Sequence, residues 1–294
     1  MKKQIIMALA VAFTMTACEK QIIGDEQVVD DTVVNQPTKR FTFTLKGDFS
    51  TQWTGTTRGY LAADGKDLTD VWVLDYLNGT LVQQLHQDDN TADDFGQPTL
   101  NLAYGSHHVY IIASRGQSPT LNTTSHTITF SKVLDTFYKD YEVSVVATSN
   151  GNRAVTLDRI VTKLKLIFSD AIPTTASTFN VTPGTWHYGW DYISGTPTAS
   201  ATSQTVTLSI PTSEIGKTNV FVNLFGFSSA TEWTTDVSLN AKTAGNEVLG
   251  SATLSDVPFK ANRSSEFTGP LFSAGGSMTL SLNTDWTTAH TGTW

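Results

Sequence analysis

The pattern of apolar and polar residues predicts β-strands over most of the chain. Apolar and polar side chains alternate from Phe41 to Lys46, as in a strand with one face in a core and the other in water. Residues 71–77 form a nearly continuous apolar run, which is typical of a strand buried on both faces. The dipeptide Asn78-Gly79 separates this run from residues 81–85. It predicts a hairpin with a type I′ turn, because both central residues of that turn need a positive φ.

The same pattern continues toward the C-terminus. We expect residues 99–103 to pair with residues 109–113, and residues 131–138 to form one or two helical turns with Ser131 as the cap. Residues 155–168 are expected to form one long strand. Further strands are expected at residues 127–130, 141–147, 185–192, 205–210, 219–227, 235–241, 248–254, 266–272 and 277–282.

Many short strands joined by Gly, Pro and Asn turns, with almost no helix, favour β-sandwiches over barrels and α/β folds. The turn-forming segment that ends at Asn152 predicts a boundary. We therefore expect an all-β chain with one sandwich domain at residues 39–152 and a second at residues 153–294.

The start of the chain has the pattern of an export signal. Two lysines precede an apolar stretch at residues 5–13, which is too short to span a bilayer permanently. Small residues precede Cys18 in an arrangement that resembles a bacterial lipobox, although Met15 is less usual there than leucine. We expect residues 1–17 to be a lipoprotein signal peptide and Cys18 to carry lipid. An ordinary secretory signal with an incidental cysteine is the alternative.

Residues 18–38 are expected to form a disordered tether. They are polar and acidic and hold no aromatic residue, so they cannot bury enough apolar surface to order themselves.

Composition excludes some classes of function and stabilisation. The chain has 294 residues and a net charge of −8, with no basic stripe for phosphates, so nucleic-acid binding is not expected. It holds one cysteine, so no disulfide can form within a molecule, and stability must come from packing and strand pairing.

Several segments of strand and turn together resemble a known family. These segments are 67–73, 100–105, 109–113, 159–166, 260–263 and 268–272. Together with the lipobox cysteine, they resemble the fimbrillin and fimbrial-anchor family of Bacteroidota, the lipoproteins of type V pili. The resemblance implies two tandem transthyretin-like β-sandwich domains.

The resemblance also implies a role in assembly. It implies a fimbrial subunit held at the outer membrane, on the cell surface, by lipid on Cys18 and joined to other subunits by a donated β-strand. A sheet that lacks a strand has unpaired backbone groups beside an apolar groove, and a partner's extended segment completes it. In polymerising members a trypsin-like protease cuts after an arginine near the first strand, which makes Arg40 and Arg58 the candidates here. Both are also compatible with ordinary surface positions. Anchor, stalk and tip roles stay open, with anchor or accessory subunit favoured.

A row of aromatic residues supplies the alternative function. Trp186, Tyr188, Trp190 and Tyr192 recur at every second position, so in a single strand they lie on one face. An exposed row could stack sugar rings and make the protein a carbohydrate-binding surface lipoprotein or an adhesin for a host ligand. Such rows more often fill a sandwich core, which is the favoured interpretation.

The remaining candidates for chemistry are weak. His107 and His108 would face opposite ways on a strand, so they cannot bind one metal together, and we assign them to a turn. The acidic segment 86–94 lacks the spacing of a calcium loop and is expected to be solvated. No catalytic motif is present, so neither an enzyme activity, a cofactor nor a metal is expected, although two distant carboxylates of a hydrolase would leave no motif. Residues 283–294 are expected either to plug a neighbour's pocket or to cap the chain's own core.

Overall fold

The structure, a computed structural model, describes residues 36–47, 68–198, 201–202, 204–273 and 278–283. Cys18, Arg58, most of the expected tether and residues 284–294 lie outside this part of the chain. Almost all regular secondary structure of the described residues is strand, with one 3₁₀ turn, η1 (Thr212–Glu214), and no α-helix. Within them, no helix has the length and apolar character needed to cross a membrane.

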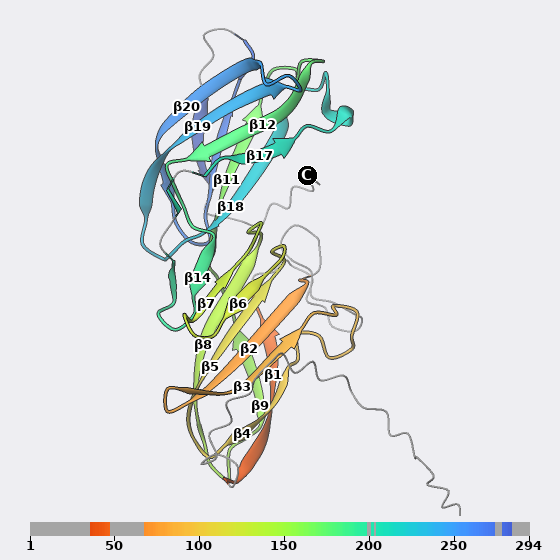
Figure 1. The fold of residues 1–294 in the computed structure, drawn as a ribbon. Coiled ribbons are helices and arrows are strands. Elements are labelled where there is room, and N and C mark those ends of the chain that lie inside the picture. The colour runs from red at the N-terminus through yellow and green to blue at the C-terminus, as the bar shows by residue number, and fades with distance from the viewer. Residues whose placement is uncertain (1–35, 48–67, 199–200, 203, 274–277, 284–294) are drawn as a thin grey trace, which may run out of the picture.

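Two sheets form the lower body in Figure 1, which we name the first sandwich. The smaller sheet has the order β4-β1-β9, with β4 (Thr99–Ala103), β1 (Thr38–Lys46) and β9 (Asn152–Thr156). The larger has the order β10-β8-β5-β2-β3, with β10 (Asp158–Arg159), β8 (Thr136–Val145), β5 (Gly105–Ser114), β2 (Asp70–Leu77) and β3 (Thr80–Gln87). Apolar side chains from both sheets, among them Phe43, Val73, Ile111 and Phe137, form one buried core.

Two four-stranded sheets form the upper body, which we name the second sandwich. One has the order β18-β11-β21-β22, with β18 (Val220–Phe227), β11 (Val161–Phe168), β21 (Ser264–Gly269) and β22 (Thr279–Asn283). The other has the order β17-β12-β19-β20, with β17 (Val206–Ser209), β12 (Ala176–Pro183), β19 (Trp233–Thr243) and β20 (Val248–Phe259). Its separate core includes Leu166, Phe168, Phe179 and Phe259.

Strands from both halves of the chain join the two sandwiches. They form a small sheet in the order β15-β14-β7-β6, with β15 (Thr196–Pro197), β14 (Gly189–Asp191), β7 (Thr127–Thr129) and β6 (Thr120–Asn122). In the sequence, β14 and β15 are flanked by β13 (Thr185–Trp186) and β16 (Ala201–Thr202), which pair with each other in a separate two-stranded sheet. A third buried cluster, mostly aromatic, draws side chains from both sandwiches, including Tyr76, Tyr138, Trp190 and Phe227.

Strand positions and the hairpin agree with the sequence predictions. The all-β sandwich fold is confirmed, and β1 covers the predicted alternating stretch. β2 and β3 form the predicted hairpin, in which Asn78 has φ 51° and Gly79 has φ 82°. β2 is buried on both faces, as its apolar run predicts.

Several local predictions of strand and helix are wrong. β4 and β5 do not pair with each other, because β4 pairs with β1 while β5 lies between β2 and β8 in the opposite sheet. Residues 131–135 are not helical, and β8 begins at Thr136, because pairing with β5 outweighs a weak local helical preference. The single strand expected at 155–168 is three strands, since the chain passes there from the first sandwich to the second.

The position of that passage bears on the expected domain boundary. β9 and β10 still pair with strands of the first sandwich, and sheet membership changes only between Arg159 and Val161. The division into domains near Asn152 stays a prediction.

Candidate functional site

β1 is the strand that the resemblance marks for function, and it is the central strand of its sheet. Residues 38–42 pair antiparallel with β4, and residues 42–46 pair in parallel with β9. The backbone N–H of Phe43 donates to Pro98 O at 2.9 Å, and that of Thr42 donates to Gly151 O at 2.8 Å. β1 is therefore hydrogen-bonded along both edges, and its loss would separate β4 from β9.

The inward face of β1 fills the core of the first sandwich. Phe41, Phe43 and Leu45 are buried, with exposed fractions of 0%, 0% and 2%. The Phe43 ring packs edge-on against Tyr141, with ring centroids 5.9 Å apart. Each such side chain contributes about 1.5–3 kcal/mol when it leaves water. We call the space between β4 and β9 that these three side chains fill the β1 slot.

Gly151 permits the close approach of the chain to β1. A Cβ at this position would clash with the carbonyl oxygen of Arg40. The turn that suggested a boundary in the sequence therefore has a packing role beside the β1 slot.

The two candidate processing residues have different places. The side chain of Arg40 is exposed, but its backbone lies in the ladder opposite Asn101. A protease that needs an extended, free backbone would have to unfold β1 before it could cut there. Arg58 lies outside the described residues, in the segment between β1 and β2.

The aromatic row does not form an exposed platform. The backbone turns within it, so that β13 and β14 are separate short strands in different sheets. Trp186 packs in the core of the second sandwich, and its Nε1 donates to Phe225 O at 3.1 Å. Trp190 and Tyr192 belong to the aromatic cluster between the sandwiches, with exposed fractions of 2% and 0%. Tyr188 is partly buried beside both clusters. This arrangement contradicts a sugar-stacking role for these rings and agrees with core packing.

The histidine pair lies in β5 and not in a turn. As expected from strand geometry, the two side chains face opposite sides of the sheet. His107 is fully buried; its Nδ1 lies 2.6 Å from Asp75 Oδ1 and its Nε2 lies 2.8 Å from Ala103 O. Because a carboxylate and a carbonyl oxygen can only accept, both ring nitrogens donate, and the ring is a charged imidazolium. It ties β5 to the end of β4, which borders the β1 slot.

This buried imidazolium predicts a pH dependence of stability. Burial opposes the charge, but the hydrogen bond and charge of Asp75 and the Ala103 carbonyl outweigh it, so the pKa of His107 is raised above its ordinary value. A raised folded-state pKa stabilises the fold fully below the unfolded value of about 6.5, and the stabilisation disappears as pH rises through the folded-state pKa. We expect the free energy of unfolding from urea titrations to be lower at pH 8 than at pH 6.

The variant His107→Gln is the control for this dependence, because glutamine keeps a donor but does not titrate. Its free energy of unfolding should differ less between the two pH values than that of the wild type. An equal difference in both proteins would assign the effect to other groups.

The acidic segment after β3 is solvated, as expected. Asp88, Asp89, Asp93 and Asp94 are exposed. Asp89 accepts hydrogen bonds from the hydroxyl and the backbone N–H of Thr91, which lower its pKa. The residues form a turn of the chain and do not converge on a common point.

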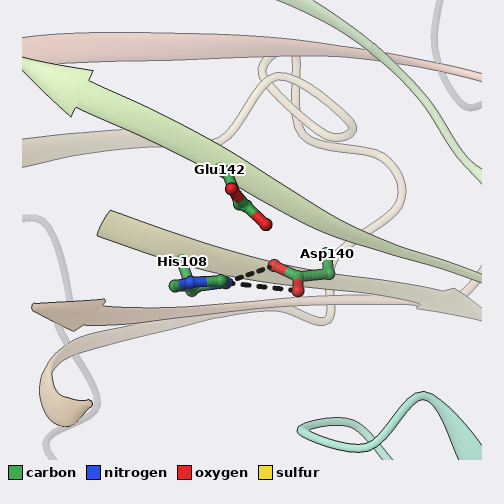
Figure 2. A group of neighbouring side chains, drawn as sticks. All are labelled: His108, Asp140 and Glu142. Atoms are coloured by element: carbon green, nitrogen blue, oxygen red, sulfur yellow. Dashed lines mark hydrogen bonds and ion pairs between the residues drawn. The ribbon is translucent and has the colours of Figure 1, made fainter. Parts of the chain in front are cut away.

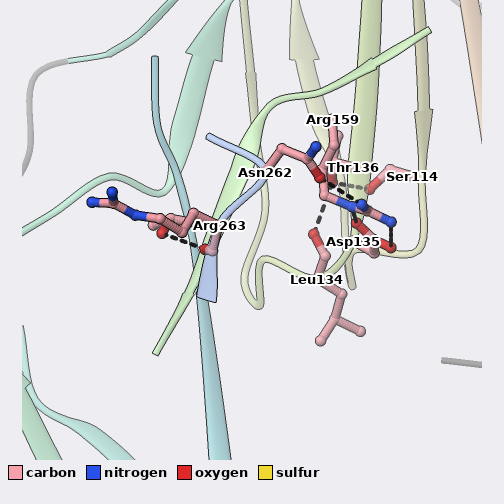
Figure 3. A network of polar contacts seen from close by, with 8 residues as sticks. Ser114, Leu134, Asp135, Thr136, Arg159, Asn262 and Arg263 are labelled. Atoms are coloured by element: carbon pink, nitrogen blue, oxygen red, sulfur yellow. Dashed lines mark hydrogen bonds and ion pairs between the residues drawn. The ribbon is translucent and has the colours of Figure 1, made fainter. Parts of the chain in front are cut away.

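A buried polar network joins the two sandwiches. The Arg159 guanidinium donates to Asp135 Oδ1 at 2.7 Å through Nε and to Asp135 Oδ2 at 3.1 Å through Nη2. Its Nη1 donates to Asn262 Oδ1 at 2.7 Å, and its Cζ lies 4.7 Å from the centroid of the Phe137 ring. Figure 3 shows Arg159 reaching both partners. Arg159 and Asn262 come from two of the segments that carried the family resemblance, so these distant segments meet here.

Sequence reasoning missed this network and the carboxylates that lie near the histidines. The signal available was a charged residue inside an apolar strand pattern, such as Asp75 in β2 or Arg159 before β11. Such residues are buried only when paired, but the pattern does not show which partner each one meets.

Comparison with known proteins concerns the fold. No family model and no curated protein matches the sequence. A candidate adhesin from Bacteroides ovatus matches at a TM-score of 0.52 and 14% identity, over 84% of this chain and 94% of that chain. A second, from Bacteroides thetaiotaomicron, matches at 0.52 and 10% identity, over 85% and 97%. Another from Bacteroides ovatus matches at 0.52 and 10% identity, over 82% and 88%. The chain therefore shares the all-β fold of these Bacteroides structures.

Proposed function

We propose that this protein is a cell-surface fimbrial subunit that takes part in adhesion and joins other subunits by exchange of a β-strand. The observation that carries the proposal is the position of β1, which is the first strand of the described residues and yet is an inner strand of its sheet, paired on both edges and buried on one face. The resemblance to the fimbrillin and fimbrial-anchor family supports it, as do the Bacteroides structures with the same fold, which are described as candidate adhesins. The role is assembly and not turnover of a substrate.

The β1 slot explains what an exchanged strand would have to provide. A donor must be extended, must pair along both edges, and must carry apolar side chains at three alternate positions to replace Phe41, Phe43 and Leu45. Because the donor restores the hydrogen bonds that β1 gives up, the exchange leaves few additional buried polar groups without a hydrogen-bond partner. The resulting joint dissociates only if a whole strand leaves the core.

A cut after Arg58 is the step that would release β1. Such a cut falls between β1 and β2, so it leaves all pairing of β1 intact but makes β1 a separate peptide that a donor can displace. A cut after Arg40 would leave Phe41, Phe43 and Leu45 in place and the β1 slot filled. We therefore favour Arg58 over Arg40 as the processing residue.

The lipid on Cys18 would hold an uncut subunit at the outer membrane. A single acyl chain binds a membrane only weakly, so retention requires several chains, as bacterial lipoproteins carry. An uncut, lipidated chain would be an anchor, and a cut chain would be a stalk or tip subunit. β22 is an edge strand of its sheet, and the residues that follow it lie outside the described part of the chain. That the C-terminal segment acts as the donor strand stays a prediction.

Limited digestion tests the proposal. The full chain is treated with a small amount of a trypsin-like protease, the new termini are read by mass spectrometry, and unheated samples are run on SDS gels. We expect the wild type to be cut after Arg58 and to form SDS-resistant multimers. Arg58→Gln should remain uncut and monomeric, whereas the matched variant Arg40→Gln should behave as the wild type. A chain that is cut after Arg58 but stays monomeric would contradict strand exchange.

A further inference from the structure

The strand register brings three metal-binding side chains together on the first sandwich. His108 of β5 lies directly opposite Glu142 of β8, and Tyr110 lies opposite Asp140. Residues two apart on a strand share a face, so His108, Asp140 and Glu142 are on the same face of the sheet. Figure 2 shows the three side chains converging from these two neighbouring strands.

The distances suit a small metal ion. His108 Nδ1 lies 3.0 Å from Asp140 Oδ1 and 3.2 Å from Asp140 Oδ2. One ligand atom from each of the three residues lies within 4.8 Å of the others. Ligand bonds of about 2.0–2.2 Å in a tetrahedral zinc site place neighbouring ligand atoms about 3.4 Å apart. The His108–Asp140 distances are close to this spacing, and the Glu142 oxygen, which lies within 4.8 Å, would move closer when an ion binds.

At the neighbouring strand positions, no lysine or arginine balances the negative charge of the two carboxylates. The positions next to them hold Ser106, Tyr76, Tyr110 and Ser144, and none of these is a lysine or an arginine. Among the described residues, the Glu142 side chain makes no hydrogen bond or ion pair, whereas its backbone pairs with His108 of β5. A cation bound at this point would offset the negative charge of Asp140 and Glu142.

The imidazole is held in place by the aromatic cluster beneath it. The rings of His108 and Tyr110 are stacked, with centroids 6.0 Å apart and an interplanar angle of 19°. Tyr110 is itself buried between Tyr76 and Tyr192, at centroid distances of 5.4 Å and 5.7 Å. The histidine side chain is 43% exposed and that of Asp140 is 34% exposed, so an ion can enter from solvent. A ligand on a rigid base loses little freedom when it binds a metal.

We propose that His108, Asp140 and Glu142 form a binding site for a divalent transition metal ion of the zinc class, with water at the remaining coordination positions. The donor set is one imidazole nitrogen and two carboxylates, which suits Zn²⁺. Ca²⁺ and Mg²⁺ take oxygen ligands almost exclusively, and the imidazole nitrogen disfavours them. This site is independent of the proposed role in strand exchange.

Metal titration of the full chain tests the site, with Zn²⁺ alone as the probe in isothermal calorimetry. We expect the wild type to bind one equivalent of Zn²⁺ at a saturable site. Weaker binding in the variants described next would assign that site to His108 and Glu142. Because the loss of an outer-shell partner already costs about 10–100-fold in metal affinity, His108→Ala and Glu142→Gln should each weaken this site by at least about 10-fold. Co²⁺ in place of Zn²⁺ should give visible absorption bands of a low-coordinate site in the wild type only.

His86 offers a matched control. Its Nε2 lies 2.8 Å from Asp70 Oδ1, and its side chain is 39% exposed, but no second carboxylate converges with this pair in the described structure. His86→Ala should leave the site unchanged. Unfolding midpoints of all three variants should match the wild type, since these side chains are partly or fully exposed. Equal Zn²⁺ affinity in His108→Ala and the wild type, or the absence of a one-equivalent site, would overturn the proposal.

Discussion

Replacement of Asp135 by alanine is expected to lower the free energy of unfolding by about 3–5 kcal/mol, because it removes two charge-assisted hydrogen bonds from a buried guanidinium. The two side chains of the Asp135–Arg159 pair have exposed fractions of only 2% and 1%. Arg159 would keep its hydrogen bond to Asn262 but lose both bonds to the carboxylate. Urea unfolding followed by tryptophan fluorescence measures the loss.

Two variants separate this explanation from a general effect of substitution. The double variant Asp135→Leu with Arg159→Met removes both charges, so it should recover much of the stability that Asp135→Ala loses. Asp158→Ala breaks the exposed pair with Lys139, in which Nζ and Oδ2 lie 3.1 Å apart, and should cost less than about 1 kcal/mol. A loss below about 1 kcal/mol in Asp135→Ala would show that the pair is not essential to the junction between the sandwiches.

Replacement of Phe43 by alanine is expected to cost about 3–5 kcal/mol of unfolding free energy, the range for large-to-small changes of a buried aromatic side chain. Phe43 has no exposed surface and contacts the rings of Phe41 and Tyr141. Its loss would leave a cavity in the middle of the β1 slot. Urea unfolding measures the change in stability, and protease digestion as described above measures its effect on exchange.

Thr44→Ala is the matched control, since Thr44 is the next residue of β1 and is only partly buried, on the opposite face. It should cost less than about 1 kcal/mol. Because Phe43→Ala weakens the hold of β1 on its slot, it should also speed the formation of multimers after a cut at Arg58, whereas Thr44→Ala should not. Similar stability losses in both variants would contradict the burial pattern of β1.

Local features of the chain were predictable because they depend on neighbours in the sequence. Alternation over Phe41–Lys46 places every second side chain on one face whatever the partner strand is. The turn at Asn78-Gly79 depends on the φ angles that these two residues accept at little cost. The aromatic row was correctly interpreted as core material, because large rings are most stable when buried.

Partners and contacts across the fold were not predictable from the pattern. β4 follows the same rules as any half-buried strand, and nothing in its five residues shows that it pairs with β1 and not with β5. The pairing is decided by how two sheets close over a common core. The row from Trp186 to Tyr192 was predicted as one strand, but the chain divides it between two clusters because it connects the sandwiches there.

The sequence by itself determined the strand-rich fold class and the position of the hairpin, since each depends on residues adjacent in the chain. Only the tertiary structure decided that β1 lies between β4 and β9, that Arg159 meets Asp135 and Asn262, and that His108 meets Asp140 and Glu142. These contacts join residues far apart in the chain, and strand register and core packing, which no local pattern encodes, bring them together.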